Sequence, residues 1–255
     1  MEHQGNNIYK AHIDANVFTK ILFNTGENGN TKSEDCSLIN DMTYINNVTL
    51  VEGEDFPYQS TVIASKAHYE RTIGLDVWGT LCLPFPISGS NQYVTFYELS
   101  GASSTALTFA PIADSPIPAG TPMLFKRISG DGSNLWIEET NVEIDPTPNP
   151  FSKAGWTMDG TFSALPNQSG IYIIYENQVC FGESEISINP YRAWFTAPSN
   201  ATGAPLRIEE AGTEGLKYVE QEDGTVKAYY DLQGRKLNGT RKDLVIENGK
   251  IIMVK

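Results

Sequence analysis

The feature that most limits what this chain can fold into is the alternation of apolar and polar residues. Within 66–73, the apolar Ala67, Tyr69 and Ile73 alternate with polar residues. Side chains of a strand point to opposite faces in turn, so this pattern predicts a strand with one buried and one wet face. Similar stretches rich in Val, Ile, Thr, Tyr and Phe predict strands at 79–85, 93–99, 105–110, 122–128, 134–140, 171–175, 178–181, 191–196 and 205–209.

Turn residues separate these strands at intervals typical of an all-β protein. Examples are Ser100-Gly101, Gly130-Asp131-Gly132 and Glu176-Asn177. Proline lacks the N–H donor that a central strand needs, so the proline-rich passages 115–122 and 145–150 are expected in loops or at sheet edges. No amphipathic segment of helical period is found. The sequence therefore predicts an antiparallel β-sandwich.

The carboxyl-terminal end has the pattern of a separate small unit. Asp223-Gly224 and Asn248-Gly249 each lie between apolar, strand-like stretches, and such pairs favour the tight turns of hairpins. We therefore expect an extended amino-terminal segment at 1–47, the end of a preceding region, then a β-sandwich at 48–212 and a small β unit at 213–255.

The charge balance excludes one class of partner. Eighteen basic and thirty-one acidic side chains give a net charge of −13 at pH 7. Nucleic acids and anionic membrane surfaces attract cationic proteins, so neither is an expected partner. No apolar run approaches the ~18 residues of a membrane-spanning helix. The start of the chain, Met1 to Gln4, lacks the basic and apolar stretches of an export signal.

The three cysteines suggest buried thiols. Cys82 and Cys180 lie in apolar surroundings, and with Cys36 they form neither a CxxC pair nor an even-numbered disulfide framework. A disulfide between Cys82 and Cys180 stays open as an alternative, and so does a catalytic thiol.

Several motifs occur in a fixed order over about 48–255. The most specific are Trp-Gly-Thr-Leu-Cys-Leu-Pro-Phe at 78–85, Tyr-Arg-Ala-Trp-Phe at 191–195 and Tyr-Asp-Leu-Gln-Gly-Arg-Lys at 230–236. With them the chain resembles a carboxyl-terminal all-β module of Bacteroidetes cell-surface and secreted proteins, which is often found behind leucine-rich repeats.

The resemblance implies an exported module that is not catalytic, located outside the cell or on its outer surface. The end of the chain also resembles, in shortened form, the sorting tails of type IX secretion, which carry a Gly-Arg step and end in Lys, as Gly234-Arg235 and Lys255 do. Lys242 and Asp243 stand before Leu244 where such tails usually have Gly-hydrophobic-Tyr, so the sorting role is an open question.

Catalytic patterns are weak. Glu138, Glu139, Glu143 and Asp145 form the densest acidic group near an aromatic residue, Trp136. Glycoside hydrolysis needs two carboxyl groups about 5–10 Å apart, and nothing in the pattern supplies that geometry. No Gly-x-Ser-x-Gly elbow, phosphate loop or complete metal-ligand set is present. We therefore expect no enzyme, no cofactor and no metal site, with glycoside hydrolysis as a third alternative.

Aromatic residues near predicted loops are the best candidates for ligand contact. Sugar rings stack on flat aromatic faces while polar neighbours hold the hydroxyl groups. The candidates are Trp136 with Asn134 and Asp131, Trp156, and Tyr93. The leading expectation is a structural and interaction module with an adhesive role, whose partner is a protein or glycan at the cell surface. The alternative is a carbohydrate-binding module that uses these aromatic residues.

Overall fold

The computed structural model of this 255-residue chain consists of β-strands. It describes residues 2–5, 8–10, 13, 18, 20–23, 36–37, 42–88, 93–112, 116–130, 134–211, 229–230, 236–237, 244–247 and 250–253. These residues fall in two compact units, Met1–Ile208 and Glu209–Lys255. The predicted all-β class is confirmed. In the described ranges no helix is long and apolar enough to cross a membrane.

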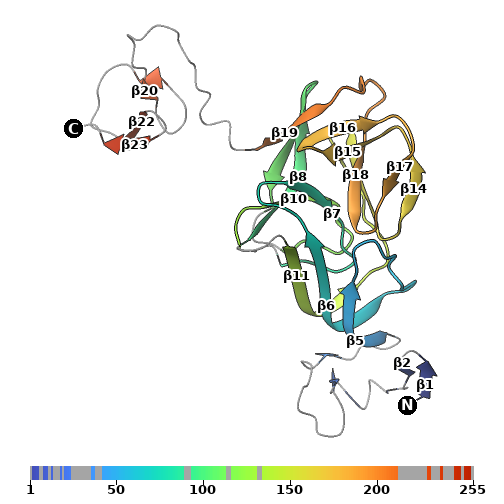
Figure 1. The fold of residues 1–255 in the computed structure, drawn as a ribbon. Coiled ribbons are helices and arrows are strands. Elements are labelled where there is room, and N and C mark those ends of the chain that lie inside the picture. The colour runs from blue at the N-terminus through green and yellow to red at the C-terminus, as the bar shows by residue number, and fades with distance from the viewer. Residues whose placement is uncertain are drawn as a thin grey trace. The chain divides into compact units, whose positions relative to one another are not determined.

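The larger unit contains a ten-stranded sheet (Figure 1). Its strands, in spatial order, are β12 (Phe151–Lys153), β13 (Trp156–Thr161), β18 (Arg192–Thr196), β15 (Ile171–Tyr175), β16 (Gln178–Gly182), β19 (Leu206–Glu210), β9 (Ala106–Pro111), β8 (Val94–Ala102), β10 (Met123–Arg127) and β7 (Trp78–Leu81).

This sheet curls until its edge strand β7 approaches β18, which lies near the opposite end of the order. The Ala193 N–H donates to Thr80 Oγ1 at 3.1 Å, and the Cys82 N–H donates to the Tyr191 carbonyl at 3.1 Å. These two contacts join residues that are remote in the strand order, so the sheet encloses an interior of its own.

A three-stranded sheet packs beside it, in the order β11 (Asn134–Ile144), β6 (Val62–Thr72) and β5 (Thr43–Leu50) (Figure 1). β11 runs antiparallel to β6, with Glu138 opposite His68, whereas β5 runs parallel to β6, with Thr49 opposite His68. The parallel pair departs from the expected antiparallel arrangement, and β5 begins before residue 48, where the sandwich was predicted to start.

Two hydrophobic cores result. The first lies between the inner face of the three-stranded sheet and strands β7, β8 and β10. The second lies on the other side of β8 and β10 and fills the curled sheet. On β10, Met123 and Phe125 face the first core while Leu124 faces the second, so this strand is buried on both faces. Strands β8 and β10 of the ten-stranded sheet thus contribute to both cores, so the architecture is not a simple pair of facing sheets.

Short antiparallel pairs complete the described structure. In the larger unit these are β1 (Glu2–Gly5) with β2 (Ile8–Lys10), β3 (Lys20–Ile21) with β4 (Cys36–Ser37), and β14 (Leu165–Gln168) with β17 (Ile186–Ile188). In the smaller unit they are β20 (Tyr229–Tyr230) with β21 (Lys236–Leu237), and β22 (Leu244–Glu247) with β23 (Lys250–Met253). The pairing that was predicted across Asn248-Gly249 is confirmed, with Glu247 opposite Lys250. Residues 216–228, which include Asp223-Gly224, lie outside the described residues.

Strand prediction succeeds where the alternation is clear. The strand expected at 171–175 is β15 itself, and the one expected at 66–73 overlaps β6, which begins earlier, at Val62, and ends at Thr72. Strands β1 to β5, β12, β13, β14, β17 and β21 were not predicted. β5 carries Asn46 and Asn47, and asparagine is depleted in strands, which explains the miss there.

Both cysteines with described side chains are free thiols, so the alternative Cys82–Cys180 disulfide is wrong. Cys82 is buried in the first core, and its thiol donates to the Gly120 carbonyl at 3.2 Å. Burial raises the pKa of the Cys82 thiol. Cys82 thus behaves as the small buried hydrophobe that was expected.

Candidate ligand-binding surface

The outer face of the three-stranded sheet carries the exposed Trp136. Alternation along β11 turns Leu135 and Ile137 into the first core and leaves Trp136 outside with 55% of its surface exposed. Its ring lies against His68 on β6, with ring centroids 3.9 Å apart and an angle of 43° between the planes. Trp136 therefore has one supported face and a large open surface.

Polar side chains surround this aromatic pair. Asn134 donates from Nδ2 to Glu70 Oε1 and accepts from Thr72 Oγ1 at 3.2 Å. On the other side, Lys66 Nζ lies 3.0 Å from Glu138 Oε1. These amide, hydroxyl and charged groups are held in place by one another around Trp136. We define Lys66, His68, Glu70, Thr72, Asn134, Trp136 and Glu138 as the tryptophan face.

A groove of about 440 Å³ adjoins the tryptophan face. His68 and Glu70 line both, so the two are continuous. The far wall of the groove is formed by Glu52, Arg71 and Arg192. Its volume falls in the range of roughly 300–1,000 Å³ that is typical of small-molecule sites.

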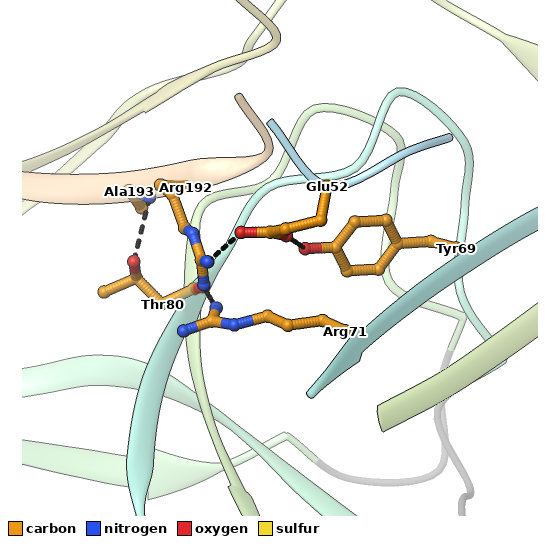
Figure 2. A network of polar contacts seen from close by, with 6 residues as sticks. All are labelled: Glu52, Tyr69, Arg71, Thr80, Arg192 and Ala193. Atoms are coloured by element: carbon orange, nitrogen blue, oxygen red, sulfur yellow. Dashed lines mark hydrogen bonds and ion pairs between the residues drawn. The ribbon is translucent and has the colours of Figure 1, made fainter. Parts of the chain in front are cut away.

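Glu52 lies at the centre of the polar contacts in this wall (Figure 2). One carboxylate oxygen accepts from the Tyr69 hydroxyl at 2.5 Å, and the other is paired with Arg192 Nη2. Burial, the hydrogen bond to Glu52 and the negative charge of Glu52 raise the pKa of the Tyr69 phenol, opposed by Arg192. The phenol is therefore held as a neutral donor to the carboxylate.

The guanidinium group of Arg71 lies beside that of Arg192 (Figure 2). Arg71 Nη1 donates to the Thr80 carbonyl on β7 at 2.9 Å, and its guanidinium lies 5.4 Å from the centre of the Phe125 ring. These contacts fix Arg71 against the ten-stranded sheet. Arg71 and Arg192 line both the groove and a second hollow of about 220 Å³.

Only part of the predicted site is found together. Trp136 and Asn134 lie two residues apart on the exposed face of β11. Tyr93 is 49% exposed. It precedes β8, and its ring lies close to Gly130 and not on the three-stranded sheet. Asp131 lies outside the described residues.

The placement of Trp156 corrects the expectation of a loop aromatic. It is 5% exposed and packs in the second core against Tyr172, with ring centroids 4.9 Å apart. The physical reason is that Trp156 opens strand β13, where Trp156 and Met158 both point inward. It offers no open ring face to a ligand.

The acidic group near Trp136 does not converge. Glu138 pairs with Lys66, Glu139 accepts from the N–H and hydroxyl of Ser88, and Asp145 accepts from the Thr147 N–H. Glu138 and Glu143 lie five residues apart on β11, and Asn141 between them has a φ of 53°, so the strand is not regular there. Glu138, Glu139 and Asp145 each have a different partner, so these three do not form the close pair that a glycosidase requires.

Arg71, Arg192 and Glu52 were not among the predicted site residues. Arg71 carried a usable signal, because it occupies an inward position between Tyr69 and Ile73 in the alternation of β6. A charged side chain at a position otherwise reserved for the core requires a partner. No comparable signal marks Glu52, because its partners Tyr69 and Arg192 lie on other strands.

The comparisons with known proteins, made against family models, curated proteins and solved structures, give no match for this chain.

Proposed function

We propose that this chain is a non-catalytic interaction module of the outer cell surface or the extracellular space, and that it contacts its partner through the tryptophan face. The observation that carries the proposal is the exposure of Trp136 on an open sheet face, where a large ring is held at 55% exposure by His68. Tryptophan is enriched at the centres of recognition surfaces because its ring buries much area on contact. The location follows from the resemblance of 48–255 to surface modules of Bacteroidetes.

The second candidate function is carbohydrate binding by the same tryptophan face. Sugar recognition combines an aromatic ring face with side chains that donate and accept hydrogen bonds from hydroxyl groups. Trp136 supplies the ring, and Asn134, Glu70 and Lys66 supply amide, carboxylate and ammonium groups on the same face of the sheet. The aromatic and polar groups are held by contacts within the sheet, so little ordering would be needed on binding.

Binding of the purified chain to an array of glycans and to cell-surface proteins tests the face. We expect Trp136→Ala to reduce retention at least about tenfold, because a central aromatic typically contributes more than 1.4 kcal/mol. Tyr175→Ala is the matched control, since Tyr175 is 60% exposed but lies on β15. Equal retention of both variants would exclude the tryptophan face as the contact surface.

The same preparations test the absence of catalysis. We expect no release of reducing sugar from any glycan that is retained. If reducing sugar is released and either Glu138→Gln or Glu143→Gln abolishes the release, the non-catalytic proposal is wrong.

A further inference from the structure

The wall of the groove brings two arginines together with one acid. Arg71 and Arg192 lie side by side, and Glu52 is paired with Arg192 (Figure 2). Glu70, the other acid that lines the groove, is engaged by Asn134 and lies 3.9 Å from His68 Nε2. Among the described contacts of this wall, one positive charge is therefore left without a paired carboxylate. This is unexpected in a chain with a net charge of −13.

Arg192 also has an unused donor. Its Nη1 atom is buried and has no hydrogen-bond partner among the described residues. A buried donor without a partner costs about 1–3 kcal/mol, so such groups are rare and need a reason. An acceptor bound in the groove or in the second hollow would supply the missing partner, because Arg192 lines both.

The backbone next to Arg192 is held in an unfavourable conformation. Tyr191 has a φ of 63°, a region that bulky side chains rarely adopt. Two backbone hydrogen bonds impose it: the Tyr191 N–H donates to the Thr161 carbonyl at 2.8 Å, and its own carbonyl accepts from the Cys82 N–H at 3.1 Å. Strain of this kind, about 1–3 kcal/mol, persists where the surroundings over-determine it and is frequent at functional sites. Arg192, the next residue, is paired with Glu52.

We propose that this groove binds the carboxylate of a uronic acid, so that the ligand of the module is an acidic glycan. The inference rests on the proposed function, because it takes the glycan that contacts the tryptophan face and assigns a binding site to its carboxylate. A guanidinium group matches a carboxylate with two parallel hydrogen bonds. One carboxylate also balances the single uncompensated charge of the wall, whereas a dianionic phosphate would add charge to an already acidic protein. Thr49 and His68 line the groove on the side towards the tryptophan face.

Calorimetry with matched glycans tests the proposal. The probes are oligomers of galacturonate, of mannuronate and of glucuronate-containing chains, each beside its neutral methyl ester. We expect the wild-type chain to bind at least one acidic oligomer about tenfold or more tightly than its ester. Arg71→Gln should remove that difference by lowering the affinity for the acid to about that for the ester. Arg207→Gln, which changes an exposed arginine outside the groove, should preserve the difference.

Two further measurements keep the test valid. Arg71→Lys retains the charge but loses the planar fork, so it should recover at most a small part of the difference. Melting curves of each variant exclude loss of the fold, and the comparison of acid with ester on the wild-type chain needs no variant.

The outcomes separate the two proposals. Equal affinity for acid and ester, lost in Trp136→Ala, would overturn the uronate inference and leave the tryptophan face as a neutral-sugar surface. Inorganic phosphate or sulfate that competes as well as a uronate would also overturn it, since the site would then bind any anion. If no glycan of either kind binds while a cell-surface protein is retained through Trp136, the inference fails and the interaction module stands.

Discussion

Glu52 and Arg192 are 140 positions apart in the chain, yet they form an ion pair whose carboxylate also accepts the Tyr69 hydroxyl. Glu52 lies in the turn after β5, and Arg192 begins β18. The pair therefore links the three-stranded sheet to the curled ten-stranded sheet. Both side chains are largely buried, with 32% and 17% of their surface exposed.

Glu52→Gln should destabilise the fold by about 1–3 kcal/mol, because a charged hydrogen bond is lost and a largely buried guanidinium loses its counter-charge. Urea unfolding measures the change. Glu138→Gln is the matched control: its ion pair with Lys66 is more exposed, at 34% and 45%, so we expect a cost below about 1 kcal/mol. A smaller cost for Glu52→Gln than for Glu138→Gln would show that the link contributes nothing to stability.

The contrast between Trp136 and Arg71 shows what could be predicted from the sequence. Strand alternation is local, so the strand expected at 134–140 is found within β11, where Trp136 is exposed and Ile137 is buried. The groove wall is not local: Glu52, Arg71 and Arg192 meet only because one sheet curls and another packs beside it. No pattern within a single strand contains that information.

Gly160→Ala should destabilise the chain by about 1–3 kcal/mol through overpacking. A Cβ at Gly160 would lie 2.8 Å from the Cβ of Cys82 and closer still to its sulfur, on the buried side of β13. Gly101→Ala is the control, because the nearest side-chain atom there, on Thr108, is 3.6 Å away. Urea unfolding again measures both.

The contact with the thiol can be isolated by a double variant. In a Cys82→Ala background the sulfur is absent, so the added cost of Gly160→Ala should fall by at least about 0.5 kcal/mol, the usual size of coupling between residues in contact. Strictly additive costs would mean that Gly160 is required for another reason.

The two thiols should differ in reactivity. In a Cys36→Ser background at pH 8, an aromatic disulfide reagent should modify Cys180 in the folded protein and Cys82 only after unfolding, because Cys82 is buried. Burial and, secondarily, the charge of Glu176 raise the pKa of Cys180, so it should react more slowly than free cysteine. Mass spectrometry of the labelled peptides distinguishes the sites. Rapid labelling of Cys82 in the folded chain would contradict its place in the first core.

The raised pKa of Tyr69 predicts how the free energy of unfolding changes at alkaline pH. Its pKa is raised in the folded state, so above pH 10 the unfolded chain releases this proton first and holds fewer protons than the folded chain. The stabilisation is thus complete below about pH 10 and is lost as the pH rises, by up to about 1.4 kcal/mol per pH unit. Burial and the nearby Asp55, Glu54 and Glu52 raise the pKa of Tyr191 as well, so both phenols contribute.

Tyr69→Phe should therefore flatten the loss of stability between pH 10 and about 11.5, while costing about 1.5–3 kcal/mol at pH 7 for the hydrogen bond to the charged Glu52. Tyr175→Phe, at a tyrosine with 60% exposure, should leave the slope unchanged. Urea unfolding at each pH gives both values. The same slope in Tyr69→Phe as in the wild-type chain would show that this phenol does not govern alkaline unfolding.

The division into two units predicts what happens when most of the smaller unit, Glu209–Lys255, is removed. Both hydrophobic cores are formed by residues up to Leu206 and Ile208, so a chain that ends at Ala211 retains every described core contact. We expect chain 1–211 to melt cooperatively within a few degrees of the full chain. A chain that ends at Ser199 should lose stability, because it lacks β19, and with it Leu206 in the second core and the pairing of Val179 with Leu206. Loss of the cooperative transition in 1–211 would mean that the larger unit depends on the residues that follow it.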